Sequence, residues 1–182
     1  GLFHCNAWAA SSNVTVAHEI GHTFQYLVSA DLGSTHGLNY VLGENSSGNE
    51  WWEDCANWQA HKVYPSAQFS ENWGNNQNMH HMNIIHEGAR YNNCYYQDWW
   101  CQLHGLNTIG RVWREATYPE DPIQAYMRIF GHDEQSFAEE QFTGYAHIAA
   151  MDIDRCYLVC VAEGIGGAIS QSEVAYSPYA WQ

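Results

Sequence analysis

The chain has 182 residues, 46% of them hydrophobic and 15% aromatic, a composition that predicts a packed globular protein and excludes a disordered one. Residues 1–182 are expected to form a single domain, because this length suits one hydrophobic core. Acidic groups outnumber basic ones by 20 to 6, so neither nucleic acid nor an anionic membrane surface is an expected partner. No apolar run reaches the length of a transmembrane helix.

The cysteine and lysine content favours a secreted protein with disulfide bonds. The six cysteines form an even set, and Lys62 is the only lysine. The spacings Cys94–Cys101 and Cys156–Cys160 suit short disulfide loops, although six cysteines allow about 15 pairings. The sequence starts at Gly1 without a signal-like segment, which suggests a processed product or a fragment.

The first predicted helix covers about four turns between residues 14 and 28, after an irregular or strand-like entry. Ser11, Ser12 and Asn13 are available to cap its start. The apolar residues at helical spacing, which we expect to face the core, are Val16, Ile20, Phe24 and Leu27.

This helix carries the pentapeptide His18-Glu19-Ile20-Gly21-His22. Positions i and i+4 share a helix face, so His18 and His22 can bind one metal ion. Glu19 follows the first histidine and would lie beside that metal. Zinc suits neutral imidazole ligands and brings no redox chemistry. The motif therefore predicts metal-assisted attack of water on a carbonyl group.

A catalytic zinc site needs a third protein ligand. No histidine follows His22 until His36, so a third histidine close downstream is absent. After a predicted loop over residues 29–49, a second helix is expected to start near Asn49 and to run through residues 51–63. Two glutamates on this helix, Glu50 and Glu53, are candidates for the third ligand.

The remaining chain is predicted to be mainly helical. Residues 66–93 are poorly periodic and are expected to cover a cleft. Residues 95–116 carry apolar residues at helical spacing in two pieces, broken around Gly105. Asp121-Pro122 predicts the start of a short helix and Gly131 its end.

A last helix is predicted to open on the capping box Ser136-x-x-Glu139. A strand is expected over residues 157–161, before a glycine-rich segment. The expected apolar face of the last helix consists of Phe137, Ala138, Phe142, Tyr145, Ala146 and Ala149.

The segment Glu53-Asp54-Cys55-Ala56-Asn57-Trp58 resembles the glutamate-helix motif of the gluzincin metallopeptidases, with Ala56 and Trp58 at the small and aromatic positions. The resemblance implies that Glu53 is the third ligand and that Asn57 steadies a ligand histidine. In a competing alignment, Asn49-Glu50-x-x-Glu53-Asp54 resembles the thermolysin-like form. There Glu50 is the ligand and Asp54 its partner; we favour Glu53.

Residues 99–154 weakly resemble a secreted zincin-like family described only as a domain of unknown function. The resemblance implies an α+β, predominantly helical zincin-like fold with few strands. Such families usually have a strand-bearing lobe before the metal-binding helix. Only 17 residues precede the motif in this chain, so we expect part of that lobe to be missing, short or supplied elsewhere.

The expected function is zinc-dependent hydrolysis of a peptide or glycoprotein substrate. His18, His22 and Glu53 would hold Zn²⁺, and Glu19 would act as general base. The side chain that stabilises the oxyanion stays open among His86, Tyr91, Tyr95, Tyr96 and His104.

The main alternative is a secreted zincin-like module that binds glycoprotein or carbohydrate without turnover. The intact Glu19 argues against it, because metal binding does not need this residue. Purely structural zinc is disfavoured, because such sites usually close with four protein ligands. Clustered surface histidines explain His80-His81 and His86-Glu87 better than a second metal does.

Overall fold

The computed structural model describes residues 7, 9–32, 51–65, 67, 84–86, 90–91, 94–150 and 153. Within these ranges the chain is helical and contains no strand, which confirms the predominantly helical character predicted from the sequence. The strand expected over residues 157–161 lies outside the described ranges. None of the described helices is long and apolar enough to cross a membrane. The elements are a 3-10 turn over Ala9–Ser11, α1 (Asn13–Leu32), α2 (Trp51–Val63), α4 (Cys94–His104), α5 (Thr108–Glu115), α6 (Pro122–Phe130) and α7 (Glu134–Ala150).

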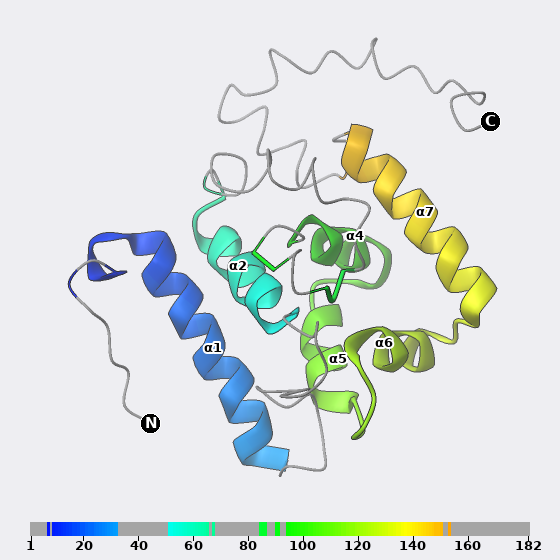
Figure 1. The fold of residues 1–182 in the computed structure, drawn as a ribbon, viewed down its shortest axis with the longest axis horizontal. Coiled ribbons are helices and arrows are strands. Elements are labelled where there is room, and N and C mark those ends of the chain that lie inside the picture. Colours follow the sequence, from blue (N-terminus) through cyan, green and yellow to red (C-terminus); the bar gives the residue numbers. More distant parts are fainter. Residues whose placement is uncertain are drawn as a thin grey trace.

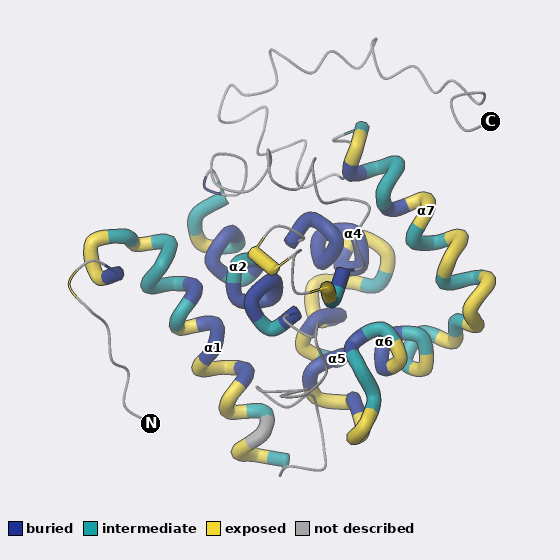
Figure 2. Tube along the Cα trace, in the orientation of Figure 1, coloured by how far each residue is buried: buried dark blue, intermediate teal, exposed yellow. Residues whose placement is uncertain are grey.

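Helices α2 and α4 lie at the centre of the assembly (Figure 1). Helix α1 packs along α2, whereas α7 packs against α4 on the opposite side. Figure 2 shows that α2 and α4 are buried over most of their length, while α1 and α7 alternate between buried and exposed residues. The metal-ligand motif of α1 therefore faces a central helix.

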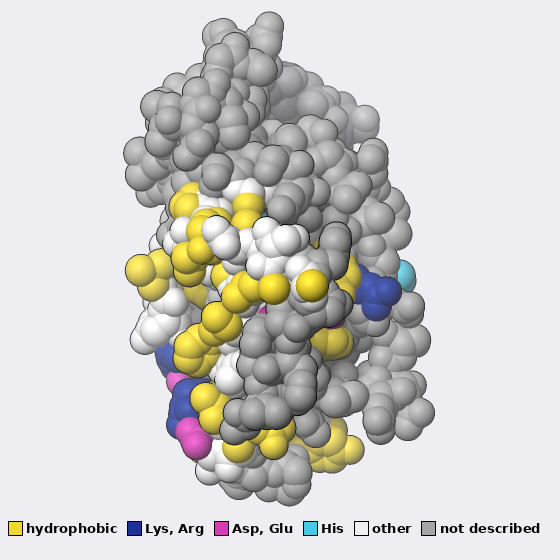
Figure 3. Space-filling view, turned by 90° about the vertical axis from the view of Figure 1, so that its left-hand side faces the viewer, with side chains coloured by type: hydrophobic (Ala, Val, Ile, Leu, Met, Phe, Trp, Pro, Cys, Tyr) yellow, Lys and Arg dark blue, Asp and Glu magenta, His cyan; other side chains and the backbone are white. Residues whose placement is uncertain are grey.

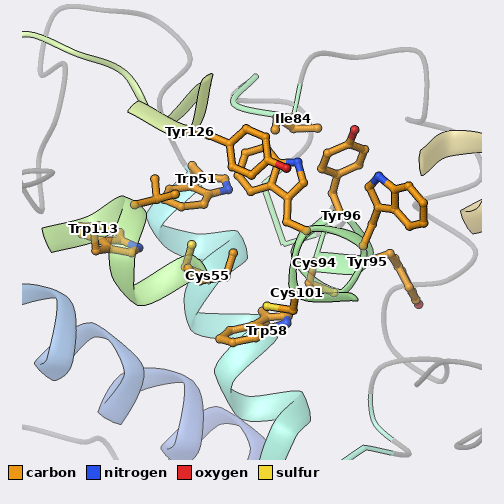
Figure 4. Packing of buried hydrophobic residues seen from close by; sticks show 14 of the residues in the cluster. Trp51, Cys55, Trp58, Ile84, Cys94, Tyr95, Tyr96, Cys101, Trp113 and Tyr126 are labelled. Carbon is orange, nitrogen blue, oxygen red and sulfur yellow. The ribbon is translucent and has the colours of Figure 1, made fainter. Parts of the chain in front are cut away.

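The core between these helices is built from aromatic side chains (Figure 4). The rings of Trp51 and Trp113 stack with centroids 5.8 Å apart, and those of Trp100 and Tyr126 stack at 3.9 Å. Each of these four side chains is at most 4% exposed. Large buried rings contribute much apolar area. This packing holds α2, α4, α5 and α6 in fixed relation to one another.

Two polar contacts add to the packing of α2 against α4. The Trp58 indole donates a hydrogen bond to Asp98 at 3.0 Å, and Lys62 forms an ion pair with the same carboxylate. Asp98 is 3% exposed, so its charge is satisfied inside the protein as burial requires. Helix α2 is thus anchored from the side opposite α1.

The helix starts and stops follow the predicted signals in α4, α5 and α6. Gly105 separates α4 from α5 and has a φ of 96°, a left-handed conformation that glycine adopts without strain. Asp121 and Gln124 form a reciprocal capping box at the start of α6, and Gly131 ends this helix in the left-handed conformation. These boundaries are confirmed as predicted.

The start of α7 lies earlier than predicted. The reciprocal capping contacts join Asp133 and Ser136: the Ser136 amide donates to Asp133 Oδ1 at 2.8 Å, and the Asp133 amide donates to Ser136 Oγ at 3.0 Å. Ser136 therefore closes the first turn and does not open the helix. The prediction from Ser136-x-x-Glu139 was wrong because an aspartate three residues upstream caps the helix first.

The buried face of α7 also differs from the prediction. Phe142 is 55% exposed, whereas Gly144 and Ile148 are buried. A Cβ on Gly144 would lie 2.6 Å from the Trp99 ring, so α7 meets α4 at a position that only glycine fills without a shift. Phe137 and Tyr145 do pack against the core, as predicted.

The apolar stripe predicted for α1 does not face the described core. Ile20, Phe24 and Leu27 are 46%, 58% and 47% exposed, and apolar side chains gather on the face of the molecule in Figure 3. The helix instead buries polar residues against α2. It also continues to Leu32, four residues into the predicted loop, while the rest of that loop lies outside the described residues.

The predicted disulfide between Cys94 and Cys101 is absent. Both cysteines are free and buried, as is Cys55. Cys94 and Cys101 lie on one helix seven residues apart, a rise of about 10 Å. A disulfide needs Cα atoms within about 7 Å. Cys5, Cys156 and Cys160 lie outside the described residues, so their pairing stays a prediction.

Candidate metal centre

Helices α1 and α2 bring three predicted ligand atoms to one point. His18 Nε2 lies 3.0 Å from His22 Nε2, and these nitrogens lie 2.9 and 3.2 Å from Glu53 Oε2. All three side chains are buried, with at most 10% of each exposed. Among the described residues, the cluster is one of two that could hold a metal ion. The structure therefore joins the motif of α1 to Glu53; the competing candidate Glu50 lies outside the described residues.

Two side-chain amides, one buried and one half-buried, fix the orientation of the imidazoles. His18 Nδ1 is 2.7 Å from Asn57 Oδ1, and His22 Nδ1 is 2.8 Å from Gln25 Oε1. The amide nitrogens donate elsewhere: that of Asn57 to the backbone oxygen of Tyr91 at 3.0 Å, and that of Gln25 to the backbone oxygen of Trp52 at 2.8 Å. Because the amide nitrogens are engaged in this way, the amide oxygens must face the histidines.

This arrangement sets the protonation pattern of the two rings. An amide oxygen only accepts, so each Nδ1 carries the proton, and each neutral imidazole keeps its Nε2 lone pair for the common point. Two such nitrogens and a carboxylate oxygen repel one another at about 3 Å unless a cation lies between them. The donor set is thus arranged for a cation.

The ionisation of the cluster agrees with this requirement. Burial alone would raise the pKa of Glu53, but the neighbouring His18, His22 and Tyr91 side chains lower it to about 2. Burial likewise lowers the pKa of His22, yet contacts with Glu53 and Gln25 and the nearby charge of Glu19 raise it overall. The raised pKa of His22 shows that its surroundings favour a positive charge at this point.

The residues fit zinc in number, type and spacing. Ligands of tetrahedral zinc at about 2.0–2.1 Å lie roughly 3.3 Å from one another. The observed separations of 2.9, 3.0 and 3.2 Å are close to that value. Glu53 Oε2 is buried and accepts no hydrogen bond of normal geometry, which leaves it available as a ligand. Three protein ligands leave a further coordination position for water or substrate.

Glu19 stands next to the cluster without belonging to it. It follows His18 on α1 and is half-buried, and its carboxylate contributes to the raised pKa of His22. It is therefore close enough to act electrostatically on the cluster and open enough to meet a substrate. The role of Glu19 as general base stays a prediction.

The structure separates the five candidates for the oxyanion-stabilising group. Tyr95 and Tyr96 are buried in the core at 0% and 1% exposure, and His104 belongs to a different cluster. His86 is exposed. Tyr91 contacts the cluster: its ring centroid is 5.9 Å from that of His18, and its hydroxyl interacts with Glu53.

The backbone of Tyr91 is held in an uncommon conformation. Its φ of 67° lies in the left-handed region, which costs a residue with a Cβ about 1 kcal/mol or more. The hydrogen bond from Asn57 to its carbonyl oxygen at 3.0 Å helps to hold it there. Asn57 thus positions both the ligand His18 and the neighbouring Tyr91.

Gly21 and Ala56 set the distance between the two metal-bearing helices. A Cβ added at Gly21 would lie 2.6 Å from Gln59 Oε1 and 3.1 Å from the Ala56 Cα. The first atom belongs to a flexible side chain, but the second is backbone and cannot move alone. The glycine therefore lets α1 approach α2 closely enough for His18 and His22 to meet Glu53.

We expect Gly21→Ala to push α1 away from α2 and to weaken zinc binding at least about tenfold, as loss of groups that orient ligands does. Gly110→Ala is the matched control, because a Cβ there meets no atom within 4 Å in the interior of α5. The control should stabilise the fold by about 0.5–1 kcal/mol and leave zinc affinity unchanged. Competition against a zinc chelator measures both; equal affinities for the two variants would refute the role of Gly21.

Comparisons with known proteins identify one matching family. The chain is a helical protein with a buried cluster of two histidines and one glutamate. A family model described as "Family of unknown function (DUF6055)" matches residues 1–166, so the chain belongs to that family. No curated protein matches the chain, and no solved structure does.

Proposed function

We propose that the protein is a zinc-dependent hydrolase of the gluzincin type that cleaves peptide bonds. The observation that carries the proposal is the convergence of His18 Nε2, His22 Nε2 and Glu53 Oε2 within 2.9–3.2 Å, with both Nδ1 atoms held by amide oxygens. The zincin-like fold and the extracellular location predicted from the sequence belong to this proposal.

Zinc bound at this site would supply Lewis acidity, which lowers the pKa of water and polarises a carbonyl group. The remaining roles fall to the protein. Glu19 accepts the proton from the attacking water and returns it to the leaving amine. Asn57 and Gln25 keep the ligand imidazoles oriented and protonated at Nδ1. Burial of the ligands excludes bulk water and strengthens these interactions.

The Tyr91 hydroxyl is the group we assign to the oxyanion. It lies beside Glu53 and His18, and 39% of the residue is exposed, so a substrate can reach it. Tyr91→Phe keeps the ring but removes the donor. We expect kcat to fall by about 10²–10³-fold with zinc content unchanged. Unchanged kcat in this variant would remove Tyr91 from the mechanism.

The function is tested by digesting a broad library of peptides and glycoproteins with the purified protein. Samples are zinc-loaded, stripped with a chelator, and reloaded with zinc, and products are read by mass spectrometry. We expect cleavage in the first and third samples and none in the second. Bound zinc without cleavage of any substrate would contradict the peptidase and favour a non-catalytic module that binds glycoprotein or carbohydrate.

A further inference from the structure

A second group of metal-binding side chains lies between α4, α6 and α7, away from the first. His104 is the last residue of α4, His132 follows the end of α6, and Glu140 lies in the second turn of α7. One ligand atom from each lies within 4.8 Å of the others. No local sequence motif marks this group, because its members are separated by 28 and 8 residues along the chain.

The distances within the group leave room for an ion. His132 Nε2 lies 3.0 Å from Glu140 Oε2, and His104 Nε2 lies 3.9 Å from the same oxygen. Despite the short distance, His132 Nε2 is buried and takes part in no hydrogen bond of normal geometry. The two atoms thus lie at ion-pair distance without the geometry of a hydrogen bond, an arrangement that two ligands of one ion also adopt.

Tyr126 orients the carboxylate. Its hydroxyl donates to Glu140 Oε1 at 2.7 Å, which leaves Oε2 directed to the histidines. The same hydroxyl lies 2.9 Å from His104 Nε2, so that this nitrogen carries a proton in the metal-free protein. Binding of a metal at this nitrogen would require the proton to move to Nδ1, because a ligand nitrogen must be unprotonated.

Aromatic rings enclose the group and limit its movement. Phe130 stacks on His104 with centroids 4.0 Å apart, and Tyr126 stacks on His132 at 5.7 Å. The three candidate side chains are 25%, 17% and 11% exposed for His104, His132 and Glu140, so solvent reaches the group only in part. Such surroundings fix the rotamers that a binding site needs.

We propose that His104, His132 and Glu140 bind a second divalent transition-metal ion. Zinc is the ion that suits two imidazoles and one carboxylate. The ion joins the end of α4 to α7 and neutralises a largely buried carboxylate in a chain with a net charge of −14. The three side chains connect helices of the core on the side away from Glu19, and water would complete the coordination of the ion.

The proposal is tested with zinc alone, independently of the proposed hydrolase. Chelator-stripped protein carrying Glu53→Gln, which disables the first site, should still bind about one zinc per chain by equilibrium dialysis and elemental analysis. Adding His132→Ala or Glu140→Gln should remove it. Zinc should also raise the Tm of Glu53→Gln, and this shift should vanish in the double variants.

His147→Ala is the matched control, because His147 also lies on α7 but stacks on Trp99 outside the group. This control should retain the zinc. Should the first-site variant fail to fold, the same count is made in the wild-type background, where His132→Ala should lower binding from about two zinc ions to about one. If the protein lost no zinc when His132 or Glu140 is replaced, the second site would be refuted. The proposal for the first site would be unaffected.

Discussion

Glu19→Gln is expected to abolish hydrolysis while the protein keeps its zinc. Glu19 is adjacent to a ligand histidine, and its carboxylate acts on His22 without joining the ligand cluster. An amide of the same size cannot accept a proton. General acid–base catalysis typically contributes about 10²–10⁴-fold, so kcat should fall by that amount. Steady-state kinetics on a peptide found in the library screen, with zinc determined in the same samples, checks the prediction.

Glu139→Gln provides the control for the lost charge. Glu139 is an exposed residue of α7 that accepts a hydrogen bond from Gln135 at 3.0 Å. Its replacement should leave kcat and zinc content unchanged. Full activity in Glu19→Gln would rule out this residue as the base. Lost zinc in that variant would instead place Glu19 among the ligands.

Glu53→Gln should have the larger effect on metal binding. The carboxylate supplies the only negative charge of the ligand cluster, and its pKa of about 2 keeps it ionised under all ordinary conditions. Replacing it should lower zinc affinity by more than about 100-fold, the upper end for groups that only orient ligands, and hydrolysis should fall to background. Equilibrium dialysis and activity assays measure the two losses.

A second readout of Glu53→Gln needs no metal. The contacts with Glu53 raise the pKa of His22, so this pKa should fall in the metal-free variant when it is followed by NMR titration. A zinc content equal to that of the wild type would show that Glu53 is not the third ligand. In that case Glu50→Gln tests the competing alignment, because the protein loses this zinc only when the true ligand is replaced.

Local patterns predicted much of the fold, since they depend on residues close in sequence. The spacing of His18 and His22 predicted that both lie on one helix face, and Asp121 with Gly131 predicted the bounds of α6. Asn57 was placed next to a ligand histidine because it follows Glu53 by one helical turn. In each case a single element carries the information.

The errors concern contacts between elements. Periodicity showed that α1 is amphipathic but not which face meets α2, and the ligands rather than Ile20 and Phe24 are buried there. Gln25 was not predicted as a partner of His22, although it lies three residues later on the same helix face, because glutamine is common on exposed surfaces. Tyr91 could be chosen only once its position next to Glu53 was known.

Locating the metal in a crystal of the zinc-loaded protein by anomalous diffraction at the zinc edge tests the proposed site most directly. We expect a peak bonded to His18 Nε2, His22 Nε2 and a Glu53 oxygen at about 2.0–2.2 Å, with one further position open to solvent. Zinc bound through an Nδ1 atom, or no zinc between α1 and α2 in a protein that hydrolyses peptides, would contradict it.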